Sequence, residues 1–292
     1  MKNSLLFSVK IGNLSSETTM ERCLNATDKK YHDLQDILRN MGSVLVAFSG
    51  GVDSAFLLKT AKDVLHDGVL AVTATSEIQL SHELEEARTL ATDIGAEHTV
   101  VQTQEMEDET FVSNPCDRCY HCKKMIFGAL RRIAEEREIP FILDGSNADD
   151  TSDYRPGMKA LEELGIRSPL KEAGLTKAEI RELSKTTGLP TWNKPAFACL
   201  ASRIPYGDRI TTEKLRRIDE AEAFLREQGI VQVRVRDHGS VARIEVSPED
   251  KSKFSDDRFA QQVNTKLKEL GFTYVALDLE GYRTGSLNSN VT

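Results

Sequence analysis

Short apolar runs alternate with longer helical stretches through the first half of the chain. The runs at residues 44–48, 69–74, 98–102 and 141–143 are brief and mostly apolar, which predicts four strands. The stretches after residue 55, at 81–94 and around Leu130 and Ile133 have helical character. This alternation predicts an α/β fold built on a doubly wound parallel sheet, with helices on both faces.

Residues 176–179 predict the start of a helix. Thr176 and Glu179 have the spacing of a capping box, and Leu175 and Ile180 have that of a hydrophobic staple. Gly188 then closes the helix. These features explain the local structure, and we assign this helix no chemical role.

The pattern changes after about Thr211. Leu215, Ile218 and Leu225 mark a helix, two alternating strands flank residues 237–240, and a further helix precedes an apolar run at 274–279. This αββαβ order predicts a separate, smaller α+β domain at the C-terminal end. We therefore divide the chain into residues 29–200 and 201–292. Residues 1–28 show no strong hydrophobic periodicity and are predicted to be a frayed tail.

Composition and charge narrow the class of protein. The chain has 292 residues, of which 39% are hydrophobic, so it can bury one large core or two modest ones. Its formal charge of −8 argues against a protein that coats nucleic acid. No apolar run reaches the roughly 18 residues of a membrane span, and the run at residues 5–7 is too short for a secretion signal. A cytoplasmic protein is expected.

A glycine loop lies between the first predicted strand and the first predicted helix. Backbone N–H groups at such a helix start favour a phosphate. Gly50 and Gly51 allow close backbone approach and positive φ, and Ser49 and Ser54 add hydroxyl donors. Asp53 is suited to hold Mg²⁺, which then bridges to pyrophosphate oxygens. A plain glycine turn is the alternative interpretation.

This loop lacks the lysine that ends a Walker A motif, so the bond between the α- and β-phosphates is the better candidate for cleavage. A second polar loop begins with Asp144 and Gly145, directly after the strand at 141–143. Open α/β sheets bind ligands at this end of their strands. Both loops are therefore predicted to belong to one ATP site.

Five cysteines are present, and three of them fall within seven residues, at Cys116, Cys119 and Cys122. Their odd number in a chain with no export signal argues against a disulfide framework. Together with Cys199, they suit an iron–sulfur cluster or a structural zinc site, and a redox pair is a further alternative. The spacing does not decide which thiols take part, and Cys23 fits an inert thiol.

A polar face is predicted on the C-terminal hairpin. Arg234 and Arg236 alternate with valines, and Arg243 and Glu245 share one face of the following strand. Arginine forks suit a phosphate or carboxylate ligand, although an ordinary solvated face has the same pattern. Arg203 adds a further guanidinium near Cys199, between the two predicted domains.

The glycine loop resembles that of the ATP-pyrophosphatase (PP-loop) superfamily, whose fold is HUP-like. More specifically, the sequence from about residue 30 to 285 resembles the LarE family, through motifs at 49–54, 153–157, 192–194, 199–207, 233–236 and 281–283. This resemblance implies that ATP adenylates a carboxylate of pyridinium-3,5-biscarboxylic acid mononucleotide. The product is then converted to a thiocarboxylate, for biosynthesis of the nickel-pincer nucleotide.

The resemblance also implies roles for particular residues. In one branch of the family a single cysteine gives up its own sulfur, and in the other three cysteines hold a [4Fe–4S] cluster that carries sulfide. Cys119, Cys122 and Cys199 resemble the cluster type, with Cys116 as an additional thiol, and Asp53 and Cys199 are the catalytic candidates. Seven positions resemble those of the substrate site, namely Ser202, Arg203, Glu222, Arg234, Arg236, Glu245 and Arg283.

Family members form hexamers, and nickel-insertion and carboxylase enzymes of the same pathway are the expected partners. Three alternatives stay open. A tRNA thiolation enzyme shares the loop and the cysteines, but the acidic balance and the lack of a recognisable RNA-binding appendage argue against it. An amidotransferase of the NAD synthetase kind has no use for the cysteines. A zinc-bound nucleotide sensor without catalytic activity is the third.

Overall fold

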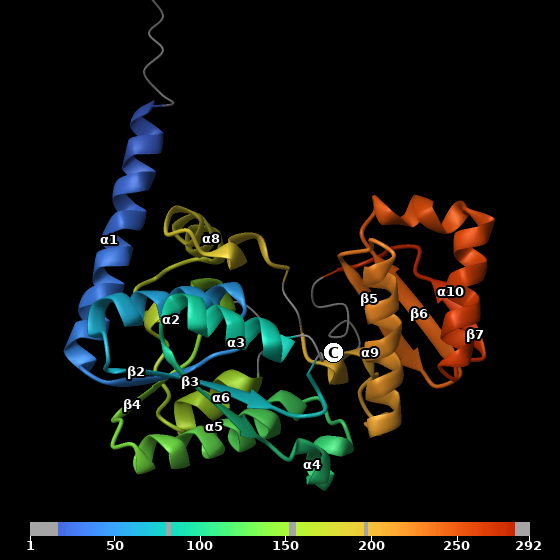
Figure 1. Ribbon diagram of the computed structural model, residues 1–292, viewed down its shortest axis with the longest axis horizontal. Helices are drawn as coiled ribbons and strands as arrows, with labels where there is room; N and C mark the ends of the chain where they lie inside the picture. The colour runs from blue at the N-terminus through green and yellow to red at the C-terminus, as the bar shows by residue number, and fades with distance from the viewer. Residues whose placement is uncertain (1–16, 80–82, 152–155, 196–197, 284–292) are drawn as a thin grey trace, which may run out of the picture.

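The computed structural model describes residues 17–79, 83–151, 156–195 and 198–283, with side chains described from residue 26 onward. The chain forms two sheets, and each is covered by helices (Figure 1). The first sheet is all parallel, has the order β3-β2-β1-β4, and pairs Val44 with both Val69 and Phe141. Its strands, β1 to β4, lie where the pattern predicts them, at Val44–Ala47, Val69–Thr75, Glu97–Gln102 and Phe141–Leu143.

Helices cover both faces of this sheet, because successive side chains of its strands point to opposite sides. Val44 and Val46 pack into a core with Phe56 on one face, whereas Leu45 packs with Leu130 on the other. The doubly wound α/β prediction is therefore confirmed. The helices are α1 to α8, at Glu17–Met41, Val52–Leu65, Glu83–Ile94, Glu109–Val112, Arg118–Glu136, Pro156–Glu163, Pro169–Glu172 and Lys177–Thr186.

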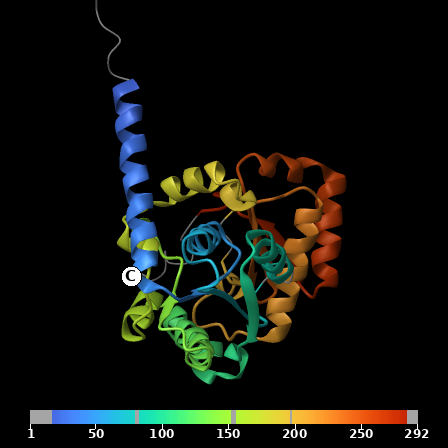
Figure 2. The same cartoon turned by 60° about the vertical axis from the view of Figure 1, so that its left-hand side comes forward.

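The N-terminal boundary differs from the prediction. Helix α1 begins at Glu17, so residues 17–28 are helical rather than part of a frayed tail, and residues 1–16 lie outside the described chain. Leu34 and Leu38 anchor the second half of α1 in the core, and Lys30 pairs with Glu179 of α8 at 2.8 Å. The helix continues N-terminally from this anchored half and projects beyond the rest of the structure (Figures 1 and 2).

The C-terminal part has the predicted αββαβ order. Strands β5 and β6 are antiparallel and β7 is parallel to β6, which makes a mixed three-stranded sheet in the order β5-β6-β7. Val233 and Val235 pack with Ala221 and Val263 from the two helices. These elements are α9, β5, β6, α10 and β7, at Thr212–Glu227, Val233–His238, Val241–Val246, Asp257–Glu269 and Tyr274–Leu277.

An apolar cluster joins the two parts of the chain. Leu200 and Ile204 pack with Phe111 of α4 and with Ile218 of α9, and the Leu200 backbone N–H donates to the carbonyl of Ile78 at 2.7 Å. This cluster fixes the short 3-10 helix η4 (Leu200–Arg203) directly after Cys199. Across the described ranges, no helix is long and apolar enough to cross a membrane.

Candidate active site

The glycine loop connects β1 to α2 in a conformation that requires glycine at one position. Gly50 has φ +69°, and a Cβ added there would lie 3.2 Å from the Cβ of Ala87. Gly51 has φ −79°, so the predicted positive φ is present at Gly50 but not at Gly51. The Ser49 backbone N–H donates to Oγ of Ser54 at 3.2 Å, which braces the turn. The loop thus delivers the N-terminus of α2 to the carboxyl end of β1.

The second loop follows β4 and packs against the start of α2. A Cβ on Gly145 would lie 3.1 Å from the backbone nitrogen of Ser54, so glycine allows a closer approach here than other residues do. Asp144 is buried and accepts hydrogen bonds from the hydroxyls of Ser146 and Ser168. Gly145 therefore shapes the phosphate loop, whereas the recorded side-chain partners of Asp144 lie within its own loop, at the start of α7, and at Lys123 of α5, 3.6 Å away.

Asp53 meets a lysine that the sequence analysis did not assign. The ammonium group of Lys177 pairs with Oδ2 of Asp53, and Asn147 donates to Oδ1 at 3.5 Å. Burial raises the pKa of the Asp53 carboxyl, although Lys177 and Asn147 favour its charged form. Lys177 is the first residue of α8, so this helix, to which the sequence analysis assigned no chemical role, contacts a predicted site residue. The capping box that positions Lys177 is confirmed.

A cleft of about 290 Å³ opens at the glycine loop and contains candidate residues from distant parts of the sequence. Asp53 lines one part of it, and Cys199 lines another. Thr73 contributes from β2, and Lys177 and Lys194 contribute positive charge. The complete lining is Ser49, Gly51, Val52, Asp53, Thr73, Gln79, Glu83, Leu84, Lys177, Lys194, Pro195 and Cys199.

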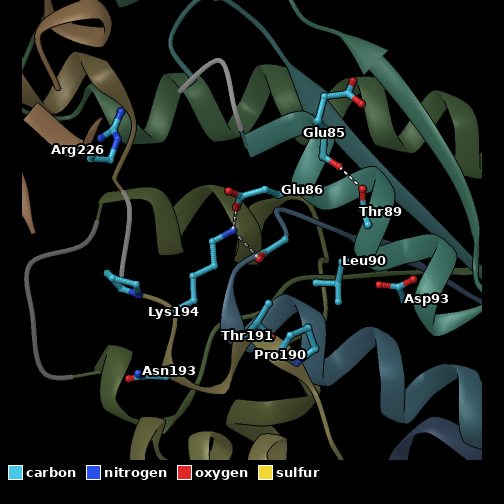
Figure 3. A pocket seen from close by; sticks show the side chains of 12 residues that line it. Glu85, Glu86, Thr89, Leu90, Asp93, Pro190, Thr191, Asn193, Lys194 and Arg226 are labelled. Carbon is cyan, nitrogen blue, oxygen red and sulfur yellow. Dashed lines mark hydrogen bonds and ion pairs between the residues drawn. The ribbon is translucent and has the colours of Figure 1, made fainter. Parts of the chain in front are cut away.

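Lys194 lines both this cleft and a larger cavity of about 810 Å³. Its ammonium group donates to the Gly50 carbonyl at 3.2 Å and pairs with Glu86 of α3 at 2.7 Å (Figure 3). Arg226 of α9 lies across the cavity from α3. Lys194 stood within a motif of the predicted resemblance, but its contact with the phosphate loop could not be inferred from its position in the sequence.

Two of the clustered cysteines share a face of α5. Cys119 and Cys122 lie one helical turn apart, whereas Cys116 precedes the helix. Cys116 and Cys119 are exposed, and Cys122 is half-buried. Cys122 and Cys199 border the same apolar cluster. Burial raises the pKa of the Cys122 thiol, and the neighbouring Cys199, Glu105 and Cys119 raise it further. The three predicted cluster ligands are therefore electrostatic neighbours.

The donor chemistry here suits a thiolate-bound metal, although the ligands do not form a closed site. In the described ranges, no group of three His, Cys, Asp or Glu side chains is placed to hold a metal ion as it stands. The guanidinium of Arg118 is buried beside these thiols and offsets a small part of the rise in the pKa of Cys122, in the direction of the thiolate form that metals bind. The side chain of Cys23 lies outside the described residues.

Most of the arginine face of the hairpin is buried rather than solvated, since Arg234, Arg236 and Glu245 are buried and Arg243 is half-exposed. The register pairs Arg234 with Glu245 and Arg236 with Arg243, so these four side chains share one face of the hairpin, as the alternating pattern predicts. Arg236 forms two hydrogen bonds with Glu245, at 3.0 and 2.7 Å, and donates to the Ser202 carbonyl at 2.7 Å. This face therefore packs against the segment that follows Cys199.

Arg203 connects the same segment to α9. It pairs with Glu222 and donates to the backbone carbonyl of Cys199 at 3.0 Å and to Oγ of Ser202 at 3.1 Å. Arg234 lies over the ring of Tyr282.

Burial lowers the pKa of Arg234 to about 10, and the charge of Arg203 contributes to this shift. Six of the seven predicted substrate positions thus lie in one region, in which five are buried and Ser202 is half-buried. Arg283 is half exposed and pairs with Glu280.

Comparisons with known proteins extend across both sheets. A family model described as asparagine synthase matches residues 34–129. A pyridinium-3,5-bisthiocarboxylic acid mononucleotide synthase from Lactiplantibacillus plantarum is 41% identical over 257 residues, which cover 87% of this chain and 92% of the relative. An uncharacterized protein from Synechocystis is 44% identical, and the match covers 91% of this chain and 99% of the relative. An uncharacterized protein from Methanocaldococcus jannaschii is 30% identical, and the match covers 88% of this chain and 96% of the relative.

Proposed function

Because the chain belongs to the LarE family of the PP-loop superfamily, we propose that it is an ATP-dependent sulfurtransferase that acts on pyridinium-3,5-biscarboxylic acid mononucleotide. The observation that carries the proposal is the shared cleft, which contains both Asp53 of the phosphate loop and Cys199. Activation of a carboxylate and delivery of sulfur would then take place in one cavity. Such proximity replaces two encounters in solution with one bound geometry.

In the first step, a carboxylate oxygen of the substrate attacks the α-phosphorus of ATP. A new P–O bond forms, the bond to the bridging oxygen breaks, and pyrophosphate leaves with the electron pair. Asp53 would hold Mg²⁺, which neutralises charge on the phosphates. The loop N–H groups at the start of α2 support the same charge.

In the second step, a sulfide-level sulfur attacks the carbonyl carbon of the acyl adenylate. A C–S bond forms, the C–O bond to AMP breaks, and AMP leaves with the electron pair. We propose that Cys119, Cys122 and Cys199 hold a [4Fe–4S] cluster, which would supply an open iron to carry sulfide. The proximity of the three thiols and the neighbouring Arg118 support this assignment.

The buried arginine region would anchor the nucleotide phosphate of the substrate. Arg203 and Arg236 both contact the segment that follows Cys199, so substrate binding and cysteine position are coupled there. Arg234 supplies a further guanidinium, and Glu222 and Glu245 orient the arginines in the unliganded protein. Arg283, next to Tyr282, would complete the site from the chain's C-terminal end.

Further assignments are proposed from the family resemblance. Residues 29–200 would form the ATP domain, and residues 201–292 the domain for substrate binding and oligomerisation. We propose a cytoplasmic hexamer that passes its product to nickel-insertion and carboxylase enzymes. The match over most of the length of the L. plantarum relative favours this function over tRNA thiolation or a nucleotide sensor.

The function is tested by incubating the anoxically purified protein with Mg²⁺, ATP and the biscarboxylated nucleotide. Formation of AMP and pyrophosphate that depends on this nucleotide is the expected result. Omission of the nucleotide serves as the control for ATP hydrolysis alone. Formation of AMP and pyrophosphate with tRNA, and not with the nucleotide, would contradict the proposal.

A further inference from the structure

The ion pair between Lys177 and Asp53 lies inside the cleft at the phosphate loop. Both side chains are partly exposed to the cleft, at 31% for Lys177 and 22% for Asp53. The two residues are 124 positions apart in the sequence, so the fold brings them together. A carboxylate already neutralised by an ammonium group has less attraction for a divalent cation.

The backbone of Lys177 is fixed, whereas its ammonium group is at the end of a flexible chain. The backbone N–H of Lys177 donates to Oδ2 of Asp149 at 2.8 Å, and the capping box of Thr176 and Glu179 fixes the same helix start. Lys30 in turn holds Glu179 at 2.8 Å. The four-carbon stem of lysine carries rotatable bonds that allow the ammonium group to change partners without any change in the helix.

Lys194, the other lysine of the cleft, is less able to change partners. It donates to the Gly50 carbonyl and pairs with Glu86, and its side chain is only 16% exposed. Those contacts hold the phosphate loop against α3. Lys177 is therefore the better placed of the two to exchange a protein carboxylate for a phosphate oxygen.

We propose that Lys177 is an exchangeable counter-ion of the ATP site. In the absence of nucleotide its ammonium group neutralises Asp53 and competes with the divalent cation for that carboxylate. When the cation and ATP bind, Lys177 releases Asp53 and binds the phosphates that leave as pyrophosphate. This inference rests on the proposed use of ATP at the loop, and it adds Lys177 as a residue that touches the leaving group.

The proposal makes two opposite predictions for Lys177→Gln. Without nucleotide, Mn²⁺ should bind about fivefold more tightly than to the wild type, because a competing cation is gone. With Mg²⁺ present, inorganic pyrophosphate should bind about tenfold more weakly, because a charge-assisted hydrogen bond is lost. Electron paramagnetic resonance of free Mn²⁺ measures the first, and calorimetry the second.

Lys185→Gln is the matched control, since Lys185 lies on the same helix but over the ring of Trp192. It should change neither affinity, and Lys177→Arg should keep Mn²⁺ binding weak. Equal Mn²⁺ affinity in the wild type and Lys177→Gln, or equal pyrophosphate affinity, would overturn the proposal. If Lys177→Gln loses helical circular dichroism, the Mn²⁺ and pyrophosphate affinities of Lys177→Met are compared with those of the wild type instead, and the same outcomes support or overturn the proposal.

These binding measurements do not use the biscarboxylated nucleotide. If the expected affinity changes occur but that nucleotide gives no pyrophosphate, the proposed substrate fails while the role of Lys177 stands. If pyrophosphate is released normally by wild type and the affinities do not change, the role of Lys177 fails alone. The two proposals can therefore be rejected separately.

Discussion

Arg203 and Glu222 form a bidentate ion pair in which both side chains are completely buried, with Nε–Oε1 and Nη2–Oε2 distances of 2.8 Å. The same guanidinium donates to the carbonyl of Cys199, and the Val235 N–H donates to Glu222 at 3.0 Å. This pair therefore ties the cysteine segment to both α9 and β5. Its geometry satisfies two charges that would be costly to bury alone.

Arg203→Met should destabilise the protein by about 3 to 5 kcal/mol, because Glu222 would remain buried with only its longer pair to Arg226, at 3.4 Å. Urea unfolding followed by circular dichroism measures the change. Arg216→Met is the matched control, since Arg216 forms an exposed pair with Glu220 on α9, the helix that carries Glu222. The control should lose less than about 1 kcal/mol. Equal losses in both variants would contradict the structural role assigned to the pair.

The same pair predicts a pH dependence of stability. Although burial alone would raise the pKa of Glu222, Arg203 and the other donors hold it below its ordinary value of 4.5. A carboxyl with a lowered folded-state pKa adds stability above pH 4.5, and that contribution is lost as the pH falls from there through the folded-state pKa. The unfolding free energy of the wild type should thus fall more steeply below pH 4.5 than that of Glu222→Gln. Parallel pH profiles would contradict this prediction.

Gly145→Ala should disturb the phosphate loop through steric contact. The new Cβ would lie 3.1 Å from the Ser54 nitrogen and 3.5 Å from the Asp53 Cβ, so the start of α2 must shift. We expect a loss of about 1 to 3 kcal/mol in stability and weaker ATP binding. Gly128→Ala is the control, because Gly128 lies within α5 with no atom within 4 Å of an added Cβ. It should be neutral or stabilising.

Local sequence signals predicted the elements that carry the site. The capping box at Thr176, the four strands of the parallel sheet and the αββαβ order depend on neighbours in sequence, and all are present. The alternation of Arg234 and Arg236 with valines also correctly placed these arginines on the same hairpin face as Glu245. Each of these features depends on periodicity or on hydrogen bonds within a few residues.

Contacts between distant segments could not be predicted in this way. The pairing of Lys177 with Asp53 requires the sheet order that places β1 next to β4, followed by the exact direction in which α8 begins. The burial of the arginine face required knowledge that η4 covers it. The extension of α1 to Glu17 has no strong apolar period in the sequence to indicate it.

The cysteine assignment predicts a specific pattern of iron loss. After anoxic purification, the wild type should contain iron and sulfide, and Cys119→Ala, Cys122→Ala and Cys199→Ala should each lose them. Cys116→Ala is the internal control and should retain iron, because Cys116 precedes α5, whereas Cys119 and Cys199 are electrostatic neighbours of Cys122. Metal analysis provides the measurement. Zinc without iron would contradict the cluster, and dehydroalanine in place of Cys199 after turnover would indicate a sacrificial cysteine instead.

Asp53→Asn should reduce pyrophosphate release by at least about 100-fold, because the amide cannot hold Mg²⁺ as a carboxylate does. The amide has nearly the same size, so helix α2 should keep its position and the protein its circular dichroism. Asp63→Asn is the matched control, since Asp63 lies on the same helix in an exposed pair with Lys59. A pyrophosphate assay over a range of Mg²⁺ concentrations distinguishes a loss of Mg²⁺ affinity from a loss of the maximal rate. If excess Mg²⁺ restores the rate of Asp53→Asn to that of the wild type, Asp53 contributes to cation affinity alone. If the rate is unchanged at every concentration, Asp53 is not the magnesium ligand.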